Sequence, residues 1–77
     1  MKELREQIDR IDAELFRLFG ERMDVVRQVA LYKKAHGLPV LDPVREREKL
    51  AEIDCPYEKK LCETLMELSR EYQEGIV

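Results

Sequence analysis

The first 35 residues carry two apolar stripes with the spacing of an α-helix. The first stripe advances in alternating steps of four and three, through Leu4, Ile8, Ile11, Leu15, Leu18, Val25, Val29 and Tyr32. The second stripe runs beside it, through Phe16, Phe19, Met23, Val26 and Ala30. Both end before His36 and Gly37, with Pro39 beyond, which is typical of a helix C-terminus. We therefore predict one long helix over residues 2–35.

A short helix is predicted next. Asp42 and Pro43 form an N-cap residue followed by proline at the first helical position. The helix they begin is expected to end near Ile53. Counting back in steps of three and four from Ile53 and Leu50 places Glu46 on the same apolar face.

A third helix is predicted over residues 56–74, with proline at its start and Gly75 as its stop. Its expected core stripe is Tyr57, Leu61, Leu65, Leu68 and Tyr72. The adjacent line is Cys62, Met66, Ser69 and Gln73, so two polar residues continue an apolar line. A capping or surface role for Ser69 and Gln73 is the alternative to a buried, functional one. Strand-like alternation is absent, and the predicted fold is all-α, with a long, a short and a medium-long helix in one domain of residues 1–77.

Arg22 occupies a position of the first stripe that should be apolar, and Lys33 ends the second stripe on the same face. Eleven residues of helix separate them by about 16 Å along the axis. Burying an unpaired guanidinium costs several kcal/mol. Arg22 therefore either pairs with a protein carboxylate or, with Lys33, receives a small dianion.

The long helix is too long for one compact chain. It would span about 50 Å, whereas a compact 77-residue globule is only about 30 Å across. The two shorter helices cannot cover both of its apolar stripes, so we predict an intertwined homodimer. Arg5 lies about 42 Å from Lys33 on the same helix, and it can join the Arg22 and Lys33 cluster only from the partner subunit.

Composition excludes several classes of function. Charged residues make up 40% of the chain, mixed in sign with a net charge of −3, which disfavours nucleic acid as a partner. No apolar run is long enough for a membrane span. Cys55, Cys62 and His36 fit no metal-ligand spacing, and no disulfide or export signal is expected. We expect a cytoplasmic protein without metal or cofactor.

In sequence, the chain resembles the small all-α chorismate mutases of the AroQ class over nearly its whole length. The resemblance lies in residues 4–12, Glu21-Arg22, residues 29–33, Pro39-Val40, Asp42, Arg45-Glu46, Ser69 and Gln73. It implies the rearrangement of chorismate to prephenate in aromatic amino-acid biosynthesis, by an intertwined homodimer with shared active sites. This reaction needs no nucleophile, proton transfer or cofactor, and the chain has no Ser/His or Cys/His arrangement.

The resemblance also implies a role for each matching residue. Arg22 and Arg5 of the partner subunit would bind the two substrate carboxylates. Lys33 would contact a carboxylate and the ether oxygen, to which Gln73 would also donate. The remaining polar residues would surround the ring: Asp42 and Glu46 near its hydroxyl, Ser69 near its carboxylate, and Arg45 as support.

One departure and two alternatives accompany this interpretation. The stretch between Glu46 and Ser69 is about ten residues shorter than in longer family members, and we expect Gln73, near the end of the sequence, to be loosely positioned. An isochorismate pyruvate-lyase on the same scaffold is one alternative, although Glu46 and the full cation set favour the mutase. A non-catalytic helical dimerisation module is the other, and it requires the cations to be paired internally.

Overall fold

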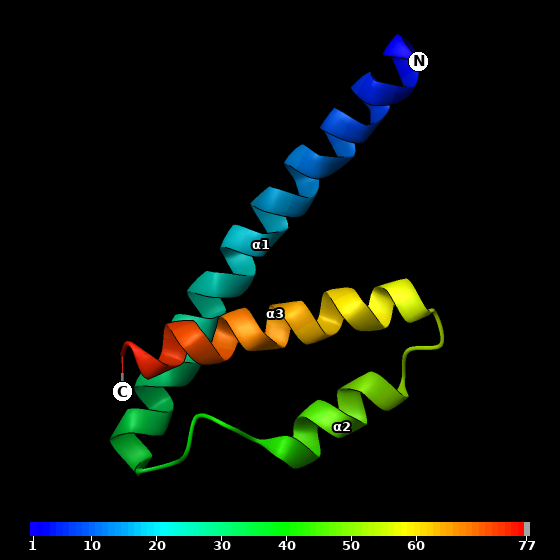
Figure 1. The fold of residues 1–77 in the computed structure, drawn as a ribbon. Helices are drawn as coiled ribbons and strands as arrows, with labels where there is room; N and C mark the ends of the chain where they lie inside the picture. Colours follow the sequence, from blue (N-terminus) through cyan, green and yellow to red (C-terminus); the bar gives the residue numbers. More distant parts are fainter. Residues whose placement is uncertain (77) are drawn as a thin grey trace.

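The computed structural model describes residues 1–76 as three helices joined by two short connections (Figure 1). They are α1 (Lys2–His36), α2 (Pro43–Ala51) and α3 (Pro56–Glu74). The all-α class and the order of long, short and medium-long helices are confirmed. Helix α2 ends two residues earlier than predicted, in a turn whose Ile53 amide donates to the Leu50 carbonyl at 3.1 Å.

The C-terminus of α1 and the N-terminus of α2 have the predicted capping residues, Gly37 and Asp42. Gly37 takes the left-handed conformation, with φ of 64°, which a residue without a side chain adopts at little cost. The Leu38 amide then closes α1 by donating to the Lys33 carbonyl at 2.9 Å. At the start of α2, the Asp42 side chain accepts from the Arg45 amide at 3.1 Å. These caps fix the connection that lies beside the site.

Helix α3 ends at Glu74, with Gly75 as its C-cap, as predicted. Gly75 lies at φ of −71°, in the right-handed region, so it does not form a left-handed cap. Gly20, inside α1, has no atom of another helix within 4 Å of where a Cβ would be. It therefore marks no close helix crossing among the described residues.

The three helices leave half of α1 without a neighbour. Helix α3 crosses the C-terminal half of α1 and also packs along α2, whereas α1 and α2 do not pack directly on each other (Figure 1). The N-terminal half of α1 extends away from both (Figure 1). The radius of gyration is 15.3 Å, larger than the roughly 11.5 Å of a compact chain of this length.

The core of the protomer lies where α1 and α3 cross, and it corrects the prediction for α3. Tyr57, at the head of the predicted core stripe, is 80% exposed, and the other members except Leu65 are also exposed. The adjacent line faces inward instead, toward the buried Val26 and Ala30 of α1. Both stripes are apolar, but a single chain has only enough helix to cover one of them. The first stripe of α1 is exposed for the same reason.

The described part of the chain contains no candidate membrane-spanning helix and no disulfide. None of its helices combines the length and the apolar character that crossing a membrane requires. Cys55 and Cys62 are free thiols.

Candidate functional site

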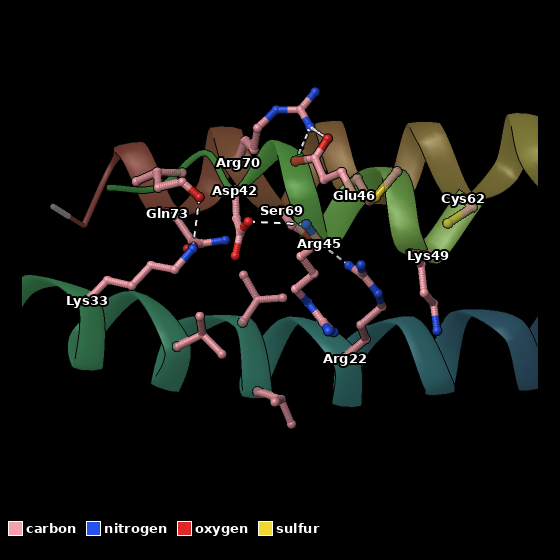
Figure 2. A pocket seen from close by; sticks show the side chains of 15 residues that line it. Arg22, Lys33, Asp42, Arg45, Glu46, Lys49, Cys62, Ser69, Arg70 and Gln73 are labelled. Atoms are coloured by element: carbon pink, nitrogen blue, oxygen red, sulfur yellow. Dashed lines mark hydrogen bonds and ion pairs between the residues drawn. The ribbon is translucent and has the colours of Figure 1, made fainter. Parts of the chain in front are cut away.

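A pocket of about 280 Å³ lies between the three helices (Figure 2). Helix α1 forms one wall, the start of α2 forms the opposite wall, and α3 lies across both. Valines from α1, with Val40, Cys62 and Met66, supply its apolar surface. Its polar lining consists of Arg22, Lys33, Asp42, Arg45, Glu46, Lys49, Ser69, Arg70 and Gln73.

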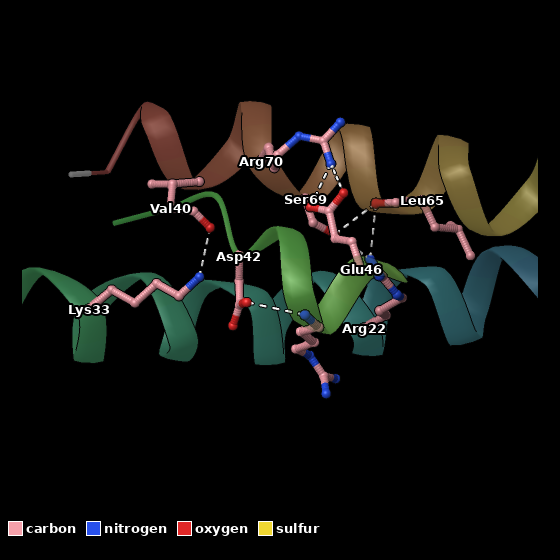
Figure 3. A network of polar contacts seen from close by, with 9 residues as sticks. Arg22, Lys33, Val40, Asp42, Glu46, Leu65, Ser69 and Arg70 are labelled. Carbon is pink, nitrogen blue, oxygen red and sulfur yellow. Dashed lines mark hydrogen bonds and ion pairs between the residues drawn. The ribbon is translucent and has the colours of Figure 1, made fainter. Parts of the chain in front are cut away.

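Arg22 lies in this pocket without a carboxylate partner. Its Nη1 donates to the Leu65 carbonyl oxygen at 3.3 Å and to the Ser69 hydroxyl oxygen (Figure 3). The Ser69 hydroxyl in turn donates to the same carbonyl at 2.7 Å. Among residues 1–76 Arg22 forms no ion pair. The predicted alternative, pairing with a protein carboxylate, is therefore wrong for the protomer: neutral groups hold the guanidinium and leave its charge uncompensated.

Ser69 and Gln73 are buried, which makes the surface role considered for them wrong. Their exposed fractions are 7% and 6%. The expected loose position of Gln73 is wrong for the same reason, because the inward line of α3 packs against α1. The Oε1 atom of Gln73 is buried without a hydrogen-bond partner among the described residues. An unpaired buried polar atom is costly, so it marks a place where a polar ligand group would be stabilised.

Lys33 lines the pocket from the same helix as Arg22, three turns further on. Its ammonium donates to the Val40 carbonyl at 2.8 Å (Figure 3). This bond ties the end of α1 to the connection that leads into α2. An ammonium group has three donors, so Lys33 keeps two for a ligand.

Glu46 faces α3 and pairs with Arg70, a residue that sequence reasoning missed. Arg70 Nη1 donates to the two carboxylate oxygens at 2.5 and 2.6 Å (Figure 3). The exposed fractions of the two side chains are 24% for Glu46 and 30% for Arg70. A carboxylate on the apolar face of a short helix requires a partner, and this requirement was the signal that could have led to Arg70.

Two further cations project from α2. Arg45 and Lys49 are four residues apart, on one face of the helix, and both line the pocket. Figure 2 shows both side chains directed toward α1. Lys49 was also missed by sequence reasoning, and its spacing from Arg45 was the available signal. Asp42, which also lines the pocket, uses one carboxylate oxygen to cap α2.

The pocket is strongly cationic although the chain as a whole is acidic. Five cations line it, against the two carboxylates of Asp42 and Glu46, in a chain of net charge −3. Concentrating positive charge in a partly enclosed space attracts and holds anions. The lining offers charge and hydrogen-bond donors, which suit the binding, positioning and electrostatic stabilisation of a small anion.

The pocket brings together seven of the eight predicted site residues and leaves out Arg5. Arg5 lies in the part of α1 that extends away from the other helices (Figure 1). Its distance from Lys33, about 42 Å along a straight helix, excludes it from this pocket within one chain. The roles of all eight remain predictions.

Comparison with known proteins identifies relatives of the chain. The family described as "Chorismate mutase type II" matches residues 4–74. The "T-protein" of Haemophilus influenzae is 48% identical over 46 residues, which are 60% of this chain and 12% of that protein. The "Bifunctional chorismate mutase/prephenate dehydratase" of Aquifex aeolicus is 46% identical over 48 residues, 62% of this chain and 13% of that protein.

A shorter relative also carries the name chorismate mutase. The "Chorismate mutase" of Methanocaldococcus jannaschii is 38% identical over 47 residues, 61% of this chain and 48% of that protein. The chain thus spans less than half the length of each of these three relatives. No solved structure matches it.

Proposed function

Since the chain belongs to the chorismate mutase type II family, we propose that it catalyses the rearrangement of chorismate to prephenate. In this unimolecular reaction one C–O bond of the ether breaks as a C–C bond forms. The observation that carries the proposal is the state of Arg22, a pocket cation held only by neutral acceptors. Such a group is available to an anionic substrate, and chorismate carries two carboxylates.

Binding would restrict the substrate to its reactive shape. A carboxylate accepts charge-assisted hydrogen bonds from a guanidinium and is thereby oriented as well as bound. Arg22 holds one carboxylate, and its guanidinium is fixed by Leu65 and Ser69. Holding the second carboxylate at another cation folds the flexible side chain over the ring. This reduces the entropy that must be lost in reaching the transition state.

The ether oxygen gains negative charge as its bond breaks, and Lys33 and Gln73 would stabilise that charge. Lys33 can donate to it while keeping its bond to the Val40 carbonyl. The Gln73 side chain lines the pocket, and its amide NH₂ group, which has no hydrogen-bond partner among the described residues, can donate to the substrate. Preorganised donors of this kind commonly contribute about 3 to 4 kcal/mol each to transition-state stabilisation.

The remaining polar residues would orient the ring. Asp42 and Glu46 provide carboxylate oxygens for the ring hydroxyl, and Ser69 lies at the ring carboxylate with Arg22. The ion pair with Arg70 supports this role for Glu46, because it fixes the carboxylate and leaves lone pairs that can still accept. Arg45 supports the same polar group from α2.

We infer that two chains share each site. Leu4, Ile8 and Ile11, in the first half of α1, are each more than half exposed, and a second copy would cover them. In an antiparallel pairing of two α1 helices, Arg5 of the partner subunit reaches the pocket and binds the second carboxylate. The support for this arrangement is the uncovered length of α1 and the position of Arg5 outside its own pocket.

Incubation of the purified protein with chorismate and, separately, with isochorismate tests the function. Consumption of chorismate with accumulation of prephenate is the expected result. Release of pyruvate from isochorismate, without formation of prephenate, would assign the chain to the lyase reaction. A protein inert toward both compounds would be a non-catalytic dimerisation module.

A further inference from the structure

Lys49 is a pocket cation to which the family resemblance gives no role. It lies on α2 one turn after Arg45, and its side chain is directed across the pocket toward α1 (Figure 2). Among the described residues its ammonium makes no hydrogen bond and no ion pair. Lys49 thus brings a positive charge to the pocket that no group of the described chain neutralises.

Each of the other pocket cations except Arg45 has a hydrogen-bond acceptor among the described residues. Arg22 donates to Leu65 and Ser69, and Lys33 donates to Val40. Arg70 is neutralised by Glu46. The guanidinium of Arg45, like the ammonium of Lys49, has no partner among residues 1–76. The two pocket cations whose charged groups make no hydrogen bond to the described residues are therefore neighbours on one face of α2.

Arg45 and Lys49 are both exposed, so their repulsion has only a small cost, which a bound anion would remove. Side chains four residues apart on a helix are neighbours, with Cβ atoms about 5–6 Å apart, and like charges at this spacing destabilise the helix. A carboxylate bound at Lys49 replaces that repulsion with attraction. It also joins α2 to α1, two helices that among residues 1–76 are connected only through α3 and the short loop after α1.

We propose that Lys49 is a substrate-binding residue that pairs with the ring carboxylate of the dianionic substrate, opposite Arg22. The identity of the dianion rests on the proposed function. The choice of carboxylate follows from Figure 2, in which Lys49 lies toward the Arg22 end of the pocket and Lys33 toward the other end. Ser69, expected near the ring carboxylate, is bonded to Arg22 at the same end. Lys49 and Arg22 then bind one carboxylate from opposite walls.

The test combines variants of the protein with variants of the ligand. The ligands are a bicyclic dicarboxylate that mimics the transition state and the same compound with its ring carboxylate reduced to a neutral hydroxymethyl group. The variants are Lys49→Met, Lys49→Arg and, as a matched control, Lys59→Met on the exposed surface of α3, outside the pocket. Methionine has nearly the helix propensity of lysine, so these changes preserve the helices. Calorimetry gives Kd for each pair, and steady-state kinetics give KM and kcat.

Lys49→Met should raise Kd for the dicarboxylate and KM for chorismate about tenfold, which corresponds to about 1.4 kcal/mol, and should change kcat much less. It should leave Kd for the hydroxymethyl compound unchanged, because the charge that Lys49 contacts is missing there. Lys49→Arg should restore most of the affinity, and Lys59→Met should match the wild type. Equal losses for both ligands would assign Lys49 a structural role and overturn the proposal. Unchanged affinity for the dicarboxylate would overturn it as well.

The outcome separates this proposal from the proposed function. A protein that binds the dicarboxylate through Lys49 but does not convert chorismate would keep the binding role and lose the mutase assignment. A protein that converts chorismate equally well with methionine at position 49 would keep the mutase assignment and lose the role of Lys49. A wild-type protein that binds no dicarboxylate would contradict both.

Discussion

Arg70 on α3 donates to both carboxylate oxygens of Glu46 on α2, at 2.5 and 2.6 Å. This ion pair links α2 to α3, which is the only helix that α2 packs on in the described part of the chain. The wall of the pocket that carries Arg45 and Lys49 is therefore held in place through Glu46. One ion pair thus couples the stability of the small α2 helix to the shape of the site.

Replacing Arg70 with methionine should destabilise the protein by about 1 to 2 kcal/mol, because Glu46 would remain partly buried without its partner. Urea unfolding at equal protein concentration measures the loss. The matched control is Arg17→Met, which removes two exposed ion pairs, with Glu14 and Glu21, and should cost less than about 1 kcal/mol. Equal losses in the two variants would contradict a structural role for the Arg70 pair.

Lys33→Ala should lower kcat by about 10²- to 10³-fold, the usual effect of removing one donor to a developing negative charge. The helical content of the protein should be unchanged in circular dichroism, since alanine favours helix. Lys34→Ala, at the next position and exposed on α1, serves as the control and should keep its activity. A kcat near the wild-type value in Lys33→Ala would exclude Lys33 from the reaction.

Gln73→Met should separate stability from activity. Because Oε1 of Gln73 is buried without a partner, an apolar side chain of similar shape should leave stability unchanged or raise it by about 1 kcal/mol. The same change should lower kcat, because the donor to the ether oxygen is lost. Thermal unfolding and steady-state kinetics give the two quantities. A clear loss of stability would show that the amide serves mainly to hold α3 against α1.

Ile8→Glu should convert the dimer to a monomer and abolish activity. Ile8 belongs to the exposed first stripe of α1, and a charge placed there would have to be buried in the interface at a cost of several kcal/mol. Gln7→Glu adds the same charge at the neighbouring exposed position outside the stripe and should leave the dimer intact. Sedimentation velocity distinguishes the two forms. An active Ile8→Glu monomer would contradict the shared site.

The helices and the main cations could be predicted from the sequence because the signals are local. The apolar periodicity predicted the three helices. Gly37 ends α1 and Asp42 begins α2, as predicted. Arg22 stood out because a charge interrupts an otherwise apolar stripe, and this anomaly led directly to the pocket. Helix spacing then placed Lys33 on the same face.

The orientation of α3 could not be predicted, because the choice between its two apolar lines depends on tertiary packing. The line containing Tyr57 was expected inside, yet the line containing Ser69 and Gln73 packs on α1. Arg70 and Lys49 were missed for a related reason. In a chain with 40% charged residues, a lysine or arginine on a helix surface is not distinctive until another helix is placed beside it.

Complementation between two inactive variants tests the central claim, a cationic pocket that is shared by two chains and rearranges chorismate. Arg5→Ala and Lys33→Ala homodimers, each expected to be inactive, are mixed in equal amounts, unfolded and refolded. In a heterodimer one site has both substitutions and the other has neither. Random pairing should therefore restore about a quarter of the wild-type activity. Prephenate formation at that level is the predicted result, and no recovery in a mixture that contains verified heterodimers would contradict the account.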